Sequence, residues 1–203
     1  MPTYEIEEKM SAEGYNAVCG IDEAGRGPLS GPVCAAAVIL PRGLIIEGLN
    51  DSKKLTAKKR EKLFDIIIQS AIAYGIGLAS PEEIDAINIL NADMLAMKRA
   101  IEALQTPADF ALVDGNIARD LPIPAMPVIK GDALSYSIAA ASVLAKVTRD
   151  RLCLEDDKNY PEYGFAKHKG YGTKDHMDAL RRLGPSPIHR KSFLKFLDEN
   201  EKP

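Results

Sequence analysis

The sequence of 203 residues has no tryptophan, few other aromatic residues and only three cysteines. Cys19, Cys34 and Cys153 are widely separated and form no Cys-x-x-Cys pair, which argues against a disulfide framework and favours reduced, buried thiols. A cysteine nucleophile would need a positioned histidine. All three histidines lie far from the cysteines in sequence, so the sequence does not support such a pair.

Long apolar runs are also missing. None approaches the roughly 18–20 residues that a membrane span requires. Residues 1–8 are acidic, rather than basic and then apolar, so no secretory signal is visible. These absences lead us to expect a cytoplasmic protein that does not contact a membrane.

Net charge is small as well, at −3, which by itself argues mildly against a nucleic-acid partner. The distribution of charge matters more than the sum, because lysine and arginine concentrate in four segments: 53–62, 146–151, 167–174 and 190–195. A solvated face is the default interpretation of each segment. Four such segments beside a group of carboxylates favour a nucleic-acid partner only modestly.

Hydrophobic residues at 46% and charged residues at 27% are typical of one globular domain with a sizeable core. Apolar runs and turn residues predict strands at 17–21, 31–40, 74–79, 110–114 and 126–129. Helical spacing and caps predict helices at 56–74, from 80, at 91–104, 135–156, 173–183 and 192–199. Strands followed by helices indicate a three-layer α/β domain, with a helical appendage at the C-terminus.

The acidic pair Asp22-Glu23 stands at the end of the first predicted strand. Burying two unpaired carboxylates is costly, so a positive charge is expected nearby. A flexible loop, Gly25-Arg26-Gly27-Pro28, follows at once. The pair therefore predicts one side of a metal site.

Two further acids end or follow predicted strands. Asp114 could be a turn aspartate, and Asp132 could cap the long helix that follows it. Taken together with Asp22, they are expected to meet at the carboxyl ends of the strands, where α/β sheets bind ligands. Crowded carboxylates need cations between them, and oxygen donors without histidine or cysteine favour Mg²⁺ or Mn²⁺. Two such ions would activate a water and stabilise the leaving oxygen of a phosphodiester.

Strand geometry restricts the acidic pair, because successive side chains point to opposite faces of a sheet. Asp22 and Glu23 can face one site only if the strand ends or kinks at Glu23. Otherwise Glu23 would contribute partly through its backbone.

Several longer motifs resemble those of the type 2 ribonucleases H, specifically the bacterial ribonuclease HII family. The resemblance extends in order from about residue 19 to residue 193. It is carried by the following segments: Gly20-Ile21-Asp22-Glu23-Ala24-Gly25-Arg26-Gly27-Pro28-Leu29-Ser30-Gly31-Pro32-Val33, Asp51-Ser52-Lys53-Lys54-Leu55, Val113-Asp114-Gly115, Lys130-Gly131-Asp132, Ser142-Val143-Leu144-Ala145-Lys146-Val147-Thr148-Arg149-Asp150 and His168-Lys169-Gly170-Tyr171-Gly172-Thr173.

The resemblance implies a ribonuclease-H-like fold in a single catalytic domain, 1–203. The α/β core would span about 17–156, with a mixed sheet flanked by helices, and about 157–203 would complete the substrate groove. The implied catalytic and metal-binding acids are Asp22, Glu23, Asp114 and Asp132. The family binds divalent ions, Mg²⁺ or Mn²⁺, and two ions are expected with substrate bound.

The family's substrates are RNA–DNA hybrids and DNA duplexes that contain single ribonucleotides. Cleavage on the 5′ side of a ribonucleotide would leave a 5′-phosphate and a 3′-hydroxyl, for ribonucleotide excision and primer removal during DNA replication. By resemblance, Gly25-Arg26-Gly27 would sense the ribose 2′-hydroxyl and Tyr171 would pack against the sugar. Lys53 and Lys146 are candidate phosphate contacts, although Lys146 could instead pair with Asp150 one helical turn away.

Two alternatives remain at this point. The same groove could recognise hybrid duplexes without cutting them, with the carboxylates in a structural role. The related ribonuclease HIII carries an additional N-terminal substrate-binding domain, and the 21 residues that precede Asp22 are too few for it. We therefore expect ribonuclease HII activity from a monomer.

Overall fold

Five strands form one mixed sheet in the computed structural model, which describes residues 2–199. The strands are β1 (Val18–Ala24), β2 (Val33–Ile39), β3 (Ala73–Ala79), β4 (Phe110–Asp114) and β5 (Ala125–Val128). Their order is β3-β2-β1-β4-β5, with β2 antiparallel to β1 and β3, and with β4 parallel to β1 and β5. All five predicted strands are confirmed.

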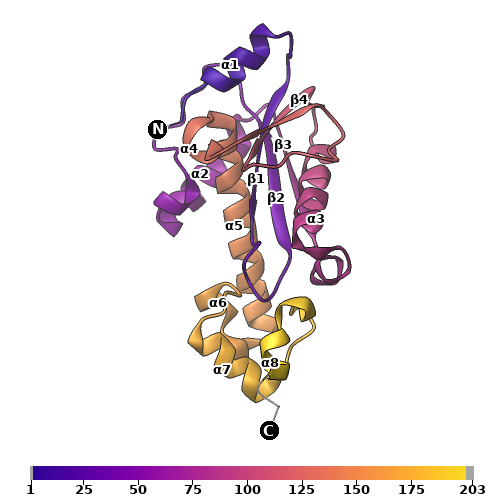
Figure 1. The fold of residues 1–203 in the computed structure, drawn as a ribbon. Coiled ribbons are helices and arrows are strands. Elements are labelled where there is room, and N and C mark those ends of the chain that lie inside the picture. Colours follow the sequence, from indigo (N-terminus) through magenta and orange to yellow (C-terminus); the bar gives the residue numbers. More distant parts are fainter. Residues whose placement is uncertain (1, 200–203) are drawn as a thin grey trace.

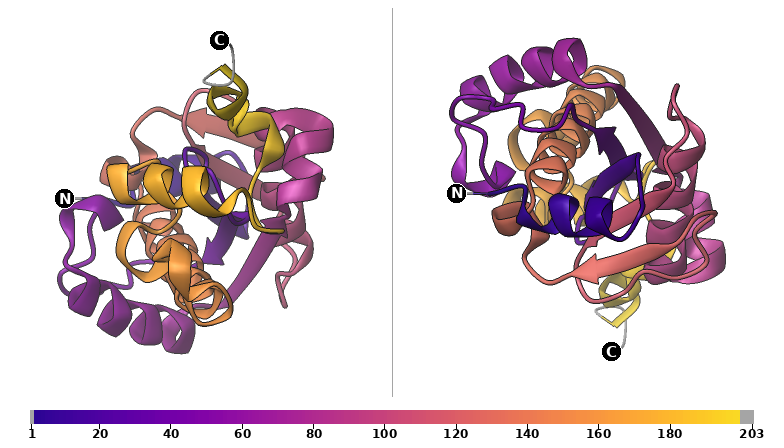
Figure 2. Two further views of the ribbon diagram at one scale, coloured as in Figure 1. Left: turned by 90° about the horizontal axis from the view of Figure 1, so that it is seen from below. Right: turned by 90° about the horizontal axis from the view of Figure 1, so that it is seen from above.

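Helices cover both faces of this sheet. The helices of residues 2–199 are α1 (Glu5–Ala12), α2 (Ala57–Ser70), α3 (Pro81–Glu102), α4 (Gly131–Leu134), α5 (Tyr136–Asn159), α6 (Phe165–His168), α7 (Lys174–Leu183) and α8 (Lys195–Glu199), with short 3₁₀ turns η1 (Ser52–Lys54), η2 (Pro161–Tyr163) and η3 (Lys191–Phe193). One core lies between the sheet and α3, and another lies between the sheet and α2 and α5 (Figures 1 and 2). The predicted three-layer α/β architecture is confirmed.

Two glycines let helices approach the sheet closely. A Cβ atom at Gly20 of β1 would lie 2.2 Å from the backbone nitrogen of Ile138 in α5. A Cβ atom at Gly77 of β3 would lie 2.0 Å from the carbonyl oxygen of Ala96 in α3. Side chains are excluded at both contacts, so β1, which carries the acidic pair, packs directly on α5.

The helices differ from prediction in several places, and the last one, expected at 192–199, is η3 followed by α8. α2 ends at Ser70, not near residue 74, because Ile72 donates its N–H to Ile39 at 2.9 Å and leads into β3. The two helices expected from 80 to 104 form α3, which has its predicted capping box and a kink at Asn88. Helix α1 was not predicted; its Glu7 accepts hydrogen bonds from Ser135 and Ser137, so residues distant in sequence hold it.

The helical C-terminal region has its own small core. Tyr163, Phe165, Ala179, Leu180 and Leu194 are buried together there. Helix α5 extends from the sheet down to this region, as Figure 1 shows. Within residues 2–199, no helix combines the length and the apolar character that crossing a bilayer requires.

Candidate active site

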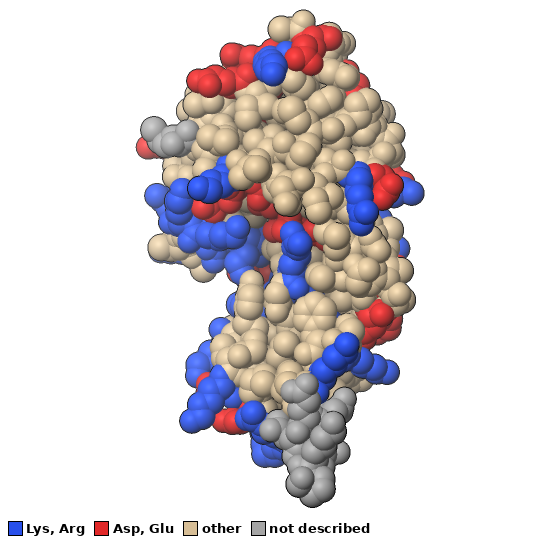
Figure 3. All heavy atoms as spheres, in the orientation of Figure 1, with Lys and Arg blue, Asp and Glu red and all other residues tan. Residues whose placement is uncertain are grey.

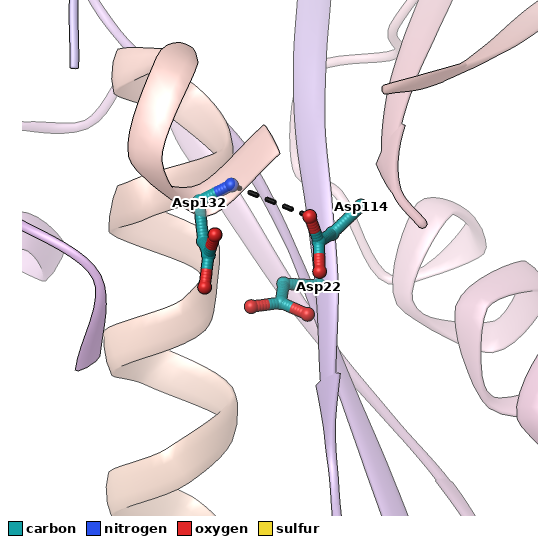
Figure 4. Close-up of side chains that lie close together, drawn as sticks. All are labelled: Asp22, Asp114 and Asp132. Atoms are coloured by element: carbon teal, nitrogen blue, oxygen red, sulfur yellow. Dashed lines mark hydrogen bonds between the residues drawn. The ribbon is translucent and has the colours of Figure 1, made fainter. Parts of the chain in front are cut away.

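Three carboxylates meet at one edge of the sheet. Asp22 lies on β1, Asp114 ends β4 and Asp132 lies in α4. Oxygen atoms from the three side chains all lie within 4.8 Å of one another. Figure 4 shows them around a common space, with the N–H of Asp132 donating to Oδ1 of Asp114 at 3.3 Å. The structure thus brings together three of the four predicted acids.

Sheet pairing explains this convergence. Strands β1 and β4 are parallel, with Ile21 opposite Val113, so the next residues, Asp22 and Asp114, are adjacent where both strands approach their carboxyl ends. Asp132 reaches them because Gly131 has no side chain. A Cβ atom there would lie 2.6 Å from Ile138 and 3.3 Å from Oδ1 of Asp114.

The electrostatics of this cluster favour a bound cation. Burial, followed by repulsion from Glu23 and Asp114, raises the pKa of Asp22 well above its usual value. Burial, followed by repulsion from Asp114 and Asp51, also raises the pKa of Asp132. A divalent cation would remove both penalties. Three oxygen donors without a histidine or cysteine ligand fit Mg²⁺ or Mn²⁺ better than zinc.

Glu23 does not join the cluster. Strand β1 continues to Ala24, so alternation places Glu23 on the same face as Ile21, which belongs to the core beneath α3. Its backbone N–H donates to Oδ1 of Asp22 at 2.7 Å, while its carboxylate lies 3.7 Å from Arg26. The restriction on the acidic pair and a catalytic role for Glu23 both stay predictions.

Asp93 of α3 is a fifth acid near the site that sequence reasoning missed. Its side chain is 1% exposed, its Oδ1 has no hydrogen-bond partner among the described residues, and its Oδ2 lies 3.5 Å from Nε of Arg26. Burial, followed by repulsion from Glu23, raises the pKa of Asp93 to about 8 against the attraction of Arg26. A lone carboxylate between the apolar residues Ala92 and Met94 was the available signal.

The glycine-rich loop faces Tyr171. A Cβ atom at Gly27 would lie 3.6 Å from Cε1 of Tyr171, whose side chain is half exposed. Gly25 has φ +101°, a conformation that L side chains rarely adopt. The structure therefore places the loop that follows the acidic pair beside the predicted sugar-packing tyrosine, 144 positions further along the chain from Gly27.

The two candidate phosphate contacts differ in their surroundings. Lys53 is exposed, and its Nζ lies 3.9 Å from Oδ2 of Asp132. Although desolvation opposes it, attraction by Asp22 and Asp132 raises the pKa of Lys53 and keeps the ammonium charged. Lys146 donates to Asp150 at 2.6 Å, so the ion pair weighed as an alternative from sequence is confirmed.

The molecular surface is hollowed between the sheet and the C-terminal helices. Figure 3 shows acidic atoms inside this recess and basic side chains along its sides. Not every basic residue is solvated, however. Arg149 and Arg190, from two of the four basic segments, are fully buried, so the default interpretation as a solvated face was wrong for both.

A mixed sheet flanked by helices, with clustered carboxylates at its central strands, defines a metal-dependent nuclease of the ribonuclease-H-like fold class. Within that class, the family model for Ribonuclease HII matches residues 19–196. The chain belongs to the ribonuclease HII family.

Individual relatives agree with this assignment. The chain is 57% identical over 192 residues to Ribonuclease HII of Caldicellulosiruptor saccharolyticus, covering 95% of this chain and 94% of the relative. The structure is similar to ribonuclease H2 from Pyrococcus horikoshii OT3, with a TM-score of 0.75 and 28% identity over 91% of this chain and 98% of the other. It also shares its fold with Bst-RNase HIII in complex with Mn²⁺, at a TM-score of 0.58 and 15% identity over 86% and 73% of the two chains.

Family membership makes the protein a hydrolase, an endoribonuclease that acts on RNA in RNA–DNA duplexes. The alternative of a binding module without catalysis is not supported. The expected ribonuclease HII assignment is confirmed over ribonuclease HIII by the matched family model.

The surroundings of the two lysines predict different mutant effects. We expect Lys53→Ala to weaken duplex binding about fivefold, because a charged, exposed ammonium is lost. The slope of the logarithm of the binding constant against the logarithm of the salt concentration should fall in magnitude by about one. Lys146→Ala should change binding less than about twofold, because Asp150 already holds that ammonium. Titrating fluorescent duplex at several salt concentrations in EDTA measures both. Equal losses in the two variants would contradict this distinction.

Proposed function

We propose that the protein cuts the RNA strand of RNA–DNA hybrids and cuts on the 5′ side of single ribonucleotides embedded in duplex DNA. The products would be 5′-phosphate and 3′-hydroxyl ends, as needed for ribonucleotide excision and primer removal in the cytoplasm. The observation that carries this proposal is the position of Gly27 opposite Tyr171, in the loop that follows Asp22 of the acidic cluster by a few residues. Ribose recognition and hydrolysis would therefore occupy one continuous groove.

The recognition part of this proposal rests on Gly25, Arg26, Gly27 and Tyr171. Without side chains, the two glycines allow backbone groups to approach a sugar closely. The 2′-hydroxyl both donates and accepts hydrogen bonds, so backbone groups can distinguish ribose from deoxyribose. Tyr171 offers a flat apolar face to the sugar and a polar tip to water. Lys53 would contact a phosphate, whereas Lys146, which Asp150 holds, would add little to phosphate binding.

For catalysis we propose that Asp22, Asp114 and Asp132 hold Mg²⁺ or Mn²⁺, with Glu23 as a fourth ligand. Two bound ions would supply activation of a water and stabilisation of the leaving oxygen. The carboxylates set where the ions bind, and burial of the cluster limits access of bulk water. The charged Lys53 ammonium adds positive charge beside Asp132.

We also propose that residues 1–203 act as a single catalytic unit and as a monomer. The C-terminal region, about 157–203, would complete the groove, because it supplies Tyr171 opposite the loop of the α/β core. Light scattering of the protein alone and with duplex would test the monomer.

A cleavage assay tests the function directly. A labelled DNA duplex with one ribonucleotide is incubated with the protein and Mg²⁺ or Mn²⁺, beside an all-DNA duplex and a long hybrid. We expect a cut on the 5′ side of the ribonucleotide and no cut in all-DNA duplex, since only the ribose offers a 2′-hydroxyl. Absence of product at stoichiometric protein, or cleavage of the all-DNA control, would contradict the proposal.

A further inference from the structure

We propose that Arg190, at the C-terminal end of the fold, is a positioning residue that sets the conformation of the loop 25–28 and thereby the preference for ribose. This inference rests on the proposed function. It concerns a residue that is distant from the loop in sequence and does not belong to the acidic cluster.

Arg190 is buried against the loop. Its guanidinium is 0% exposed. Nη2 donates to the carbonyl oxygen of Gly25 at 2.6 Å, and Nη1 donates to those of Arg26 at 3.0 Å and Pro28 at 2.8 Å. Nε donates to the carbonyl oxygen of Gly31 at 2.9 Å. One side chain therefore binds four carbonyl groups within seven residues.

No carboxylate forms a salt bridge with this guanidinium within the part of the chain that the structure describes. Burial is strong enough to lower the pKa of Arg190 to about 9. A buried cation without a salt bridge depends mainly on the dipoles around it. The loop carbonyls supply those dipoles, so the loop conformation and the burial of Arg190 depend on each other.

The hydrogen bonds of Arg190 also orient the N–H groups of the loop. In a trans peptide unit, the carbonyl oxygen and the following N–H point in opposite directions. The carbonyls of Gly25 and Arg26 point to Arg190, so the N–H groups of Arg26 and Gly27 point away from it. In residues 2–199 these two N–H groups donate to no other residue. They are free for a ligand on the side opposite Arg190.

The segment around Arg190 is tied to the Tyr171 side of the groove as well. The N–H of Arg190 donates to the carbonyl of Leu29 at 2.9 Å, and the N–H of Leu29 donates to that of Gly170 at 2.8 Å. Nε2 of the neighbouring His189 lies 2.9 Å from Nε2 of His176, whose Nδ1 donates to the carbonyl of Tyr171 at 2.9 Å. Substitution of the Arg190 side chain keeps these ties on the tyrosine side and removes only the guanidinium bonds to the loop carbonyls, so it should move the loop relative to the tyrosine.

The test compares Arg190→Lys and Arg190→Ala with wild type by their binding to two duplexes in EDTA, one all-DNA and one with a single ribonucleotide. We expect both variants to bind all-DNA duplex within about twofold of wild type, because the groove charges remain. The ribose preference should fall about tenfold or more in Arg190→Ala, and kcat for the single-ribonucleotide duplex should fall with it. Arg190→Lys should keep only part of the ribose preference and of kcat that Arg190→Ala loses, since one ammonium cannot donate to four carbonyls as the guanidinium does.

Asp85→Ala is the matched control. Asp85 accepts hydrogen bonds from the N–H groups of Lys191 and Ser192, so its loss loosens the same segment but keeps the guanidinium. We expect this variant to lose stability and keep the ribose preference. Folded Arg190→Lys with wild-type preference and kcat would overturn the proposal, as would an equal loss of preference in Asp85→Ala. Wild type that binds both duplexes equally would also overturn this proposal, whereas failure of wild type to cut the single-ribonucleotide duplex would overturn the proposed function.

Discussion

Asp114→Asn and Asp132→Asn are each expected to lower the cleavage rate by about 10³-fold or more and to leave the fold intact. Both carboxylates belong to the cluster whose oxygens lie within 4.8 Å of one another. An amide of the same shape keeps the packing but removes the negative charge that holds a divalent ion. Single-turnover cleavage of a duplex with one ribonucleotide, at saturating Mg²⁺ or Mn²⁺, measures the loss.

The same cluster predicts a change in metal-free stability. Burial and neighbouring acids raise the pKa of Asp132, so the folded state keeps its proton at a pH where the unfolded state has released it. Stability therefore falls as pH rises above the unfolded pKa of about 4. Asp132→Asn removes this penalty, and we expect it to be more stable than wild type by about 1 kcal/mol at pH 8 in EDTA.

Urea denaturation in EDTA and in Mg²⁺ completes this test. Added Mg²⁺ should stabilise wild type, because it binds only the folded cluster, and should stabilise Asp132→Asn less. Asp65→Asn, on an exposed position of α2, is the control and should match wild type in both rate and stability. Wild-type cleavage rates in the Asp114 and Asp132 variants would show that the site is assigned wrongly.

Alanine at Gly25 should lower stability, whereas alanine at Gly27 should leave stability nearly unchanged. A Cβ atom at Gly25 would lie 2.1 Å from Nε of Arg149, and the backbone φ of +101° disfavours any side chain. We expect Gly25→Ala to lower the free energy of unfolding by about 2 kcal/mol or more and to lower cleavage by about 10²-fold. The buried Arg149 cannot move aside without losing its bonds to the carbonyls of Ser30 and Lys169.

Gly27→Ala meets only Tyr171 at 3.6 Å, which is ordinary van der Waals contact. We expect its free energy of unfolding to stay within about 0.5 kcal/mol of wild type. Its kcat/KM should nevertheless fall about tenfold, because the added methyl group would cover the part of the loop and of Tyr171 that the sugar is proposed to contact. Denaturation and cleavage of the two variants side by side measure both effects. A stable Gly25→Ala, or a fully active Gly27→Ala, would contradict this account of the loop.

Much of the fold could be predicted because local pattern and fold agree. Ser80 and Glu83 form the capping box expected from their spacing, and β2 is the continuous buried strand that its apolar run predicts. Helix α1 is composed of good helix formers but has only a weak apolar pattern, with Met10 as its buried residue. Its stability depends on Ser135 and Ser137, more than 120 positions away in the sequence, which bind Glu7.

The sequence by itself determined the family and three acids of the site, because Asp22, Asp114 and Asp132 stand beside strand ends and the parallel pairing of β1 and β4 brings such ends together. Only the tertiary structure decided on which side of the sheet or loop each charged side chain lies, and which partner it contacts. It placed Glu23 outside the group of three acids and beside Arg26, buried Asp93 beside the same arginine, and gave Arg190 the loop carbonyls as partners. The physical reason is the separation along the sequence over which each effect acts. Hydrophobic and turn patterns act over a few residues. The partner of a buried charge is chosen by segments that meet only when the chain has folded.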